Sequence, residues 1–131
     1  MATGTPDGLF SWAAWPWGNT DMNTWGDETY TQVLGDKEYM MPVSPWFYTN
    51  IPAFNKNWLW PSEDLWWDRW QDVLALRPPF VQIISWNDYG EATYIGPVQP
   101  GPQEIFELAK SKYNYAPVSM AHDGWRMLLP F

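Results

Sequence analysis

Two carboxylates, Asp88 and Glu91, stand three residues apart in a segment that could perform acid–base chemistry. They follow an apolar, β-branched stretch that begins at Phe80 and predicts a buried strand. A strand holds the backbone rigid while the turn after it places side chains in a cleft, which is how α/β enzymes present acidic groups. Among the fifteen acidic residues, this pair alone comes directly after a predicted strand in aromatic surroundings.

The pair has the composition that glycoside hydrolysis requires. One carboxyl group donates a proton to the leaving oxygen, and the other activates water or attacks. Burial against Trp86 and Tyr89 would raise the pKa of one carboxyl and keep it protonated as the acid. The same pattern also fits a turn that Asp88 caps while Glu91 is solvated. Asn87 fits either a turn cap or a ligand of a sugar hydroxyl.

The tryptophan content indicates a binding surface. The chain has 12 Trp among 131 residues, and aromatic residues make up 19% of it, more than a core of this size needs. Large flat rings with a polar tip provide contact area, and they stack on the apolar faces of sugars. The alternative is a core that is unusually rich in tryptophan.

Charge and rare residue types exclude several classes of function. A net charge of −8 argues against a nucleic-acid partner, whose phosphates require a basic surface. The chain has no cysteine to act as a nucleophile, and its single histidine, His122, excludes a histidine-rich metal centre. We therefore expect neither a metal nor a cofactor. We also expect no membrane partner, because no run approaches the roughly 18 apolar residues of a span.

Apolar periodicity predicts three strands alternating with three helices. The predicted strands are residues 9–12, 39–46 and 80–86. The predicted helices are residues 27–34, 62–76 (with Ser62 as N-cap) and 102–112. Acidic residues at the helix starts, among them Asp27, are explained by the helix dipole. The alternating order predicts parallel strands with crossover helices, an α/β fold.

In such units, every strand-to-helix loop lies at the carboxyl edge of the sheet. These loops are residues 16–26, 47–61 and 87–101, and they are long, as functional loops tend to be. Most of the aromatic residues lie in them or at the adjoining strand ends: Trp15, Trp17, Trp25, Trp46, Phe47, Tyr48, Trp58, Trp60, Trp86, Tyr89 and Tyr94. The ligand is therefore expected at this edge. The helix tryptophans Trp66, Trp67 and Trp70 are expected to pack against the sheet.

Six segments resemble consecutive motifs of one family. They are FSWAAWP at 10–16, YMMPVSPWFYTN at 39–50, NKNW at 55–58, ISWNDYGE at 84–91, YIGP at 94–97 and HDGWR at 122–126. From about Asp7 onward the chain resembles the fungal α-1,3-glucanases, or mutanases, of glycoside hydrolase family seventy-one. Residues 99–118 follow the family poorly.

The resemblance implies a TIM-type (β/α)8 catalytic domain that hydrolyses α-1,3-glucan with inversion. On the matching motifs, Asp88 and Glu91 are the catalytic acidic pair. The motifs and the aromatic loop edge together give these expected substrate-binding residues: Trp15, Trp46, Tyr48, Asn50, Trp58, Trp86, Asn87, Tyr89 and Tyr94. The partner implied is an α-glucan polysaccharide.

A complete barrel needs about 250 residues, so 131 residues predict a partial TIM-type (β/α)8 barrel. We expect about three parallel β-α units in a single domain, residues 1–131, equivalent to the C-terminal part of the family's barrel. Its uncovered sheet edge would favour a homo-oligomer. The alternatives to a hydrolase are a non-catalytic α-glucan-binding or remnant protein, and an aromatic-rich protein that associates with itself.

Three further features fit a structural interpretation as well as a functional one. His122 is expected to be a structural hydrogen-bonding residue, while Lys56 fits either a ligand of substrate hydroxyls or a solvated loop lysine. Residues 1–7 lack the basic and apolar regions of a signal peptide, whereas the family resembles secreted wall-modifying enzymes. The compartment, extracellular or intracellular, stays open.

Overall fold

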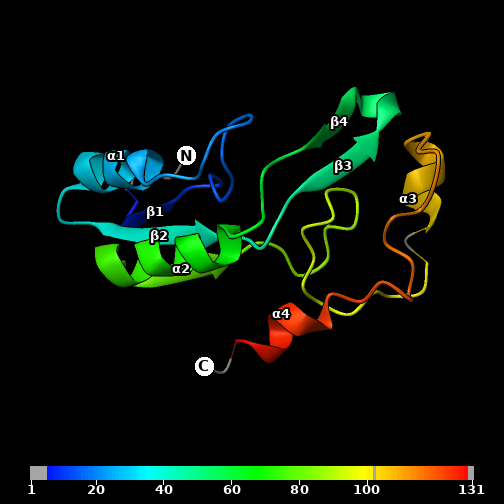
Figure 1. Ribbon diagram of the computed structural model, residues 1–131. Coiled ribbons are helices and arrows are strands. Elements are labelled where there is room, and N and C mark those ends of the chain that lie inside the picture. Colours follow the sequence, from blue (N-terminus) through cyan, green and yellow to red (C-terminus); the bar gives the residue numbers. More distant parts are fainter. Residues whose placement is uncertain (1–5, 102, 130–131) are drawn as a thin grey trace.

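The computed structural model describes residues 6–101 and 103–129, and Figure 1 shows how the elements are arranged. In chain order they are β1 (Gly8–Phe10), α1 (Trp25–Leu34), β2 (Glu38–Val43), β3 (Tyr48–Ile51), the 3₁₀ helix η1 (Pro52–Phe54), β4 (Lys56–Leu59), α2 (Leu65–Leu76), β5 (Phe80–Ile83), α3 (Gln103–Leu108) and α4 (Asp123–Met127). None of the helices in the described ranges is long and apolar enough to cross a membrane.

The three predicted strands are confirmed, and they form one parallel sheet in the order β1-β2-β5. Each strand ends two or three residues earlier than predicted. β2 ends at Val43 because Pro45, two residues later, has no N–H to give to a neighbouring strand. β5 ends at Ile83, and the N–H of Ser85 donates instead to the Thr93 carbonyl at 3.0 Å. The loops at the carboxyl edge therefore begin sooner.

Helices α1 and α2 pack on one face of this sheet. Tyr39 and Met41, two residues apart in β2, are buried against Leu34 of α1, and Val73 of α2 packs on the same cluster. Because side chains alternate along a strand, the intervening residues lie on the other face. There the register aligns one apolar residue from each strand: Phe10, Met40 and Phe80.

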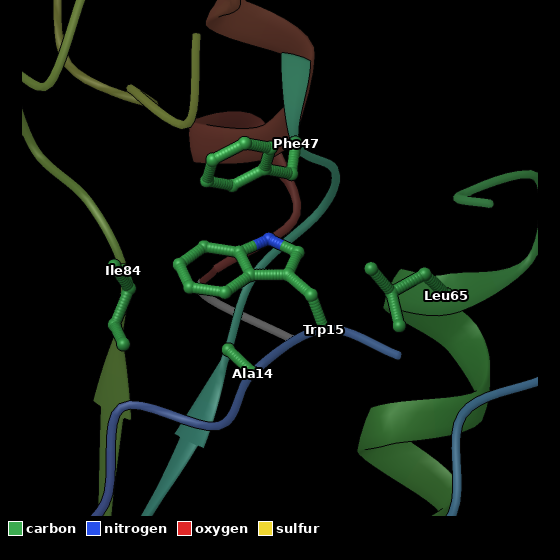
Figure 2. Close-up of a cluster of buried hydrophobic side chains, with 5 residues drawn as sticks. All are labelled: Ala14, Trp15, Phe47, Leu65 and Ile84. Atoms are coloured by element: carbon green, nitrogen blue, oxygen red, sulfur yellow. The ribbon is translucent and has the colours of Figure 1, made fainter. Parts of the chain in front are cut away.

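A second apolar cluster joins the carboxyl edge of the sheet to α2, as Figure 2 shows. Trp15, from the loop after β1, packs edge-on against Phe47, from the loop after β2, with ring centroids 5.2 Å apart. Ile84 at the end of β5 and Leu65 at the start of α2 complete the cluster. The Trp15 indole N–H also donates to the Trp46 carbonyl at 2.8 Å. The cluster thus fixes where the loops leave the sheet.

The prediction of a loop at residues 47–61 is wrong, because this segment forms an antiparallel hairpin of β3 and β4. Burial alternates along β3, where Thr49 and Ile51 are buried and their neighbours are half-buried. Such alternation is typical of a strand with one covered face. Asn55, with a φ of 54° in the left-handed region, ends η1 and returns the chain into β4. The hairpin rises from the sheet at the upper right of Figure 1.

The helices differ from their predicted bounds at the ends. α2 begins at Leu65 rather than at residue 62, because the Ser62 hydroxyl donates to the Trp60 carbonyl at 2.7 Å and caps no helix. α3 ends at Leu108, and Lys110 then adopts a φ of 55° that leaves the helical region. Residue 102, the predicted start of that helix, lies outside the described residues. α4 was not predicted.

Candidate active site

Asp88 and Glu91 lie in a tight turn that follows β5. The backbone N–H of Asp88 donates to Ser85 Oγ at 3.0 Å, and Asp88 Oδ1 accepts the backbone N–H of Glu91 at 2.9 Å. Ser85 Oγ is also 2.9 Å from Thr93 Oγ1. Asp88 therefore caps the turn, as one interpretation of the sequence predicted. The cap also fixes the backbone between the two acidic residues.

Two neighbouring elements hold this turn in place. The carbonyl of Gly90 accepts the Thr49 hydroxyl at 2.9 Å and the Tyr115 hydroxyl at 2.7 Å. The backbone N–H of Tyr48 donates to the Glu91 carbonyl at 3.2 Å. Strand β3 and the segment after α3 thus hold the backbone between the two carboxylates in place. The second of these falls within residues 99–118, the stretch that follows the family motifs poorly.

Glu91 forms an ion pair with Lys56, the first residue of β4. Lys56 Nζ lies 2.7 Å from Glu91 Oε1, and the two side chains are 42% and 18% exposed. The interpretation of Lys56 as a solvated loop lysine is therefore wrong, as is that of Glu91 as a solvated turn residue. The hairpin that sequence analysis missed is what brings this cation to the acidic pair.

Burial raises the pKa of Asp88 above its ordinary value. The Glu91 charge raises it further, while the backbone N–H groups of Glu91 and Gly90 and the Lys56 ammonium lower it without cancelling the rise. Proton donors in acid–base catalysis need such a shift in order to hold their proton near neutral pH. A carboxyl group of raised pKa and a carboxyl group paired with a cation thus lie in one turn.

A cavity of about 720 Å³ opens beside the turn. Glu91, Lys56 and Asp27 provide its charged groups, and tryptophans from the loop after β1, the start of α1 and the hairpin region provide most of its apolar wall. These tryptophans are Trp12, Trp15, Trp17, Trp25, Trp58 and Trp60. A cavity of this size, lined by aromatic rings with a few charged groups, is typical of a small-ligand or oligosaccharide site.

The structure brings three predicted site residues together around this cavity: Glu91, Trp58 and Trp15. Trp58 is partly exposed on β4 and stacks in parallel with Phe47 at a centroid distance of 6.1 Å. Trp15 is mostly buried in the core cluster, so it presents little of its ring. Trp86 and Asn87 are exposed in the turn after β5 but are not part of the cavity wall.

The other predicted binding residues lie in packing positions. Tyr94 is fully buried, stacks on His122 and donates its hydroxyl to the Met120 carbonyl at 2.9 Å, so its ring has no surface for a sugar. The Trp46 indole donates to the Ala92 carbonyl at 2.6 Å. Tyr89 donates its hydroxyl to the Pro97 carbonyl at 3.1 Å.

Tyr48 and Asn50 belong to β3 and face the C-terminal segment. The Tyr48 ring packs edge-on against Tyr115 at 5.0 Å, and the backbone N–H of Asn50 donates to the Tyr115 hydroxyl at 3.1 Å. These contacts help to hold the acidic turn in place and do not form part of the cavity wall. His122, predicted to be a structural hydrogen-bonding residue, lies in such a position, since its Nδ1 is 2.7 Å from the Tyr94 carbonyl oxygen.

Sequence analysis did not predict that Asp27 lines the cavity. It was assigned to the helix dipole, but it is buried beside the cavity in an ion pair with Arg69, with distances of 2.9 and 3.1 Å between the two carboxylate oxygens and the guanidinium nitrogens. Tyr39 donates its hydroxyl to the same carboxylate at 2.8 Å, and Ser11 Oγ lies 2.9 Å from that hydroxyl. No signal in the sequence linked residues 27 and 69, because they lie on different helices.

The described residues include no group of three or more His, Cys, Asp or Glu side chains that could hold a metal ion. The structure places the two carboxyl groups of the turn beside the Lys56 ammonium and an aromatic cavity wall. Such a set can donate a proton to one oxygen and accept a proton from a water molecule.

Comparisons with known proteins show the family to which the chain belongs. The model of a family described as glycosyl hydrolase family 71 matches residues 1–131. The chain is 44% identical over 128 residues to a mutanase of Penicillium rubens, covering 93% of this chain and 27% of the relative. It is 38% identical over 125 residues to the glucan endo-1,3-alpha-glucosidase agn1 of Schizosaccharomyces pombe, covering 94% and 27%.

A third relative, the ascus wall endo-1,3-alpha-glucanase of Schizosaccharomyces pombe, is 40% identical over 94 residues, which are 70% of this chain and 21% of the relative. The chain thus spans about a quarter of the length of the curated relatives it matches. No solved structure matches.

Proposed function

We propose that this chain, which belongs to glycosyl hydrolase family 71, hydrolyses α-1,3-glucosidic bonds of α-1,3-glucan with Asp88 and Glu91 as its acid–base pair. The observation that carries the proposal is the position of Glu91, which lies in the wall of a tryptophan-lined cavity and in the same turn as Asp88, a half-buried carboxyl of raised pKa. The relatives named for action on 1,3-α-glucan support the choice of substrate.

The cavity suits a neutral polysaccharide. Indole rings offer flat apolar surfaces to the faces of pyranose rings, and the few charged groups can bind hydroxyls. Trp58 is partly exposed on β4, two residues after Lys56 on the same strand, so a sugar stacked there lies near the acidic turn. Trp17 and Trp25, both well exposed, extend the aromatic surface along the same wall.

We propose an inverting mechanism for the reaction. One carboxyl group donates its proton to the glycosidic oxygen as the bond from that oxygen to the anomeric carbon breaks. A water molecule forms the new bond to the anomeric carbon from the opposite side, and the other carboxylate takes the proton that the water releases. For this route the two carboxyl groups need a separation of roughly 6.5–9.5 Å in the complex with substrate.

The fold that we propose is part of a TIM-type (β/α)8 barrel. Three parallel strands in the order β1-β2-β5, with α1 and α2 on one face and the acidic turn at the carboxyl end of β5, support it. Active sites of such barrels lie at the carboxyl ends of the strands. The relatives' greater length leaves room for the remaining units.

We also propose that the isolated chain associates with itself through the sheet. β1 and β5 are the outer strands, and outer strands present N–H and carbonyl groups to other chains. Exposed Phe10 and Phe80 lie on the face that the helices leave open. Light scattering should show a mass that rises with concentration, whereas a constant mass of 15.4 kDa would contradict self-association.

The test of the function is reducing-sugar release from insoluble α-1,3-glucan by the purified chain. Release should be lost in Glu91→Gln and Asp88→Asn and kept in Glu107→Gln, which removes an exposed carboxylate of α3. Proton NMR of the first product should show the β-anomer if the reaction inverts. Co-sedimentation with the glucan but no release by the wild-type chain would instead support the non-catalytic glucan-binding alternative.

A further inference from the structure

The Lys56–Glu91 ion pair joins two backbone segments that other contacts also hold together. Lys56 opens β4, where it is in register with Ile51 of β3. The hairpin is bound to the acidic turn at two other points, through Thr49 to the Gly90 carbonyl and through the Tyr48 N–H to the Glu91 carbonyl. The backbone that carries the cation and the backbone that carries the carboxylate are therefore fixed relative to each other.

The surroundings of the acidic pair offer no other described cation within contact of Glu91. Asp27, the other acidic group in the cavity wall, has its charge balanced by Arg69 at 2.9 Å. The titratable groups on the neighbouring elements are Tyr48 and Tyr115. Their pKa values are raised, in Tyr48 first by its hydrogen bond with Tyr113 and in Tyr115 first by burial, so both hydroxyls remain neutral at working pH.

We propose that Lys56 is a positioning residue of the carboxylate pair, whose ammonium group holds the Glu91 side chain at the wall of the cavity, beside Asp88. The catalytic role of Lys56 rests on the proposed function, whereas its electrostatic effect on the two carboxyl groups does not. The ammonium lies 2.7 Å from one carboxylate oxygen of Glu91, and burial raises the pKa of Asp88.

The geometry predicts what happens when the cation is removed. Lys56 lowers the pKa of Asp88 through its charge, and it stabilises the negative charge of Glu91 at contact distance. Interacting carboxyl groups titrate as a pair. Loss of Lys56 should therefore raise the pKa of Asp88, because the charge that lowers it is removed.

The experiment compares Lys56→Met with Lys56→Arg and with Lys37→Met, which removes an equal charge from a lysine that donates to the Pro6 carbonyl near β1. The first readout is the pH profile of glucan hydrolysis. An opposite charge at this distance shifts a carboxyl pKa by roughly one to three units, and the partial exposure of Lys56 favours the low end. Lys56→Met should move the limb that reports Asp88 upward by about one pH unit.

Lys56→Arg should restore most of the wild-type profile, because it keeps a cation in the hairpin, and Lys37→Met should leave the profile unchanged. An unchanged profile in Lys56→Met, or an equal shift in Lys37→Met, would overturn the proposal. A structural role alone would lower the rate at every pH without moving the limbs.

The second readout separates this inference from the proposed function. Carbon-13 NMR of the side-chain carboxyls reports the titration midpoint of Asp88 without any substrate. Even if the wild-type chain releases no sugar, and the proposed function therefore fails, the Asp88 midpoint should rise in Lys56→Met and stay unchanged in Lys37→Met. An Asp88 midpoint that does not move in Lys56→Met would overturn the inference while leaving the function untouched.

Discussion

Replacement of Arg69 by Met should destabilise this protein more than any other single change of a charged side chain considered above. Arg69 is fully buried on α2 and donates to Asp27 of α1, to Asp72 and to the Pro42 carbonyl of β2. Its guanidinium thus joins both helices to the central strand. Methionine keeps much of the length of the side chain but removes every one of these donors.

The expected magnitude follows from what the substitution leaves behind. The Asp27 carboxylate, whose side chain is 1% exposed, keeps only the Tyr39 hydroxyl as a described donor. An uncompensated buried charge costs about 3–5 kcal/mol, and the Pro42 carbonyl loses a partner at a cost of about 1–3 kcal/mol. Relaxation of the structure and entry of water reduce the sum, so we expect a loss of about 4 kcal/mol. This is a large share of the roughly 5–15 kcal/mol of a typical domain.

Urea unfolding followed by tryptophan fluorescence measures this loss directly. The matched control is Arg126→Met, which breaks an exposed ion pair with Asp123 within α4 and should cost less than about 1 kcal/mol. The double variant Asp27→Leu with Arg69→Met should recover much of the loss, because it leaves no buried charge unpaired. A loss below about 1 kcal/mol in Arg69→Met, or no recovery in the double variant, would refute the reasoning.

Three further outcomes are expected. Asp88→Asn should raise the free energy of unfolding at pH 7, measured in urea, because burial raises the pKa of Asp88 and the native state therefore loses stability as pH rises above the ordinary value of that carboxyl. Trp58→Ala should weaken co-sedimentation with insoluble α-1,3-glucan about fivefold, a change of about 1 kcal/mol, while Trp67→Ala, exposed on α2, should not weaken it. Burial lowers the pKa of His122, so stability should fall as pH drops below about 6.5, and His122→Gln should flatten that limb of the urea series.

Local patterns in the sequence predicted the parallel sheet well. The strands at Leu9, Met41 and Val81 were found because short β-branched or apolar runs between turn residues carry their own signal. Their early ends were not, since Pro45 and the bond from Ser85 to Thr93 set them. The hairpin of β3 and β4 was missed because its strands, YTNI and KNWL, mix polar with apolar residues and carry no continuous apolar run.

Contacts between distant residues explain the remaining errors. Asp27 has every property of a helix-dipole residue, an acid in the first turn of α1, and only the fold reveals that Arg69 lies opposite it. The same holds for Trp46 and Tyr94, whose positions beside the carboxyl edge were predicted but whose burial depends on His122 from the C-terminal segment. Sequence spacing places a residue at an edge of a sheet, but it does not determine which way the side chain points.

The aromatic excess therefore has two explanations at once. Six tryptophans line the cavity, while others such as Trp66 and Trp70 pack against each other on α2 with ring centroids 5.6 Å apart. Tryptophans therefore contribute both to the wall of a cavity and to packing between elements. Trp15 belongs to both, since it packs in the core cluster and borders the cavity. The wall beside the acidic turn is accordingly an extension of the core, so its geometry is held by the same contacts that hold the fold.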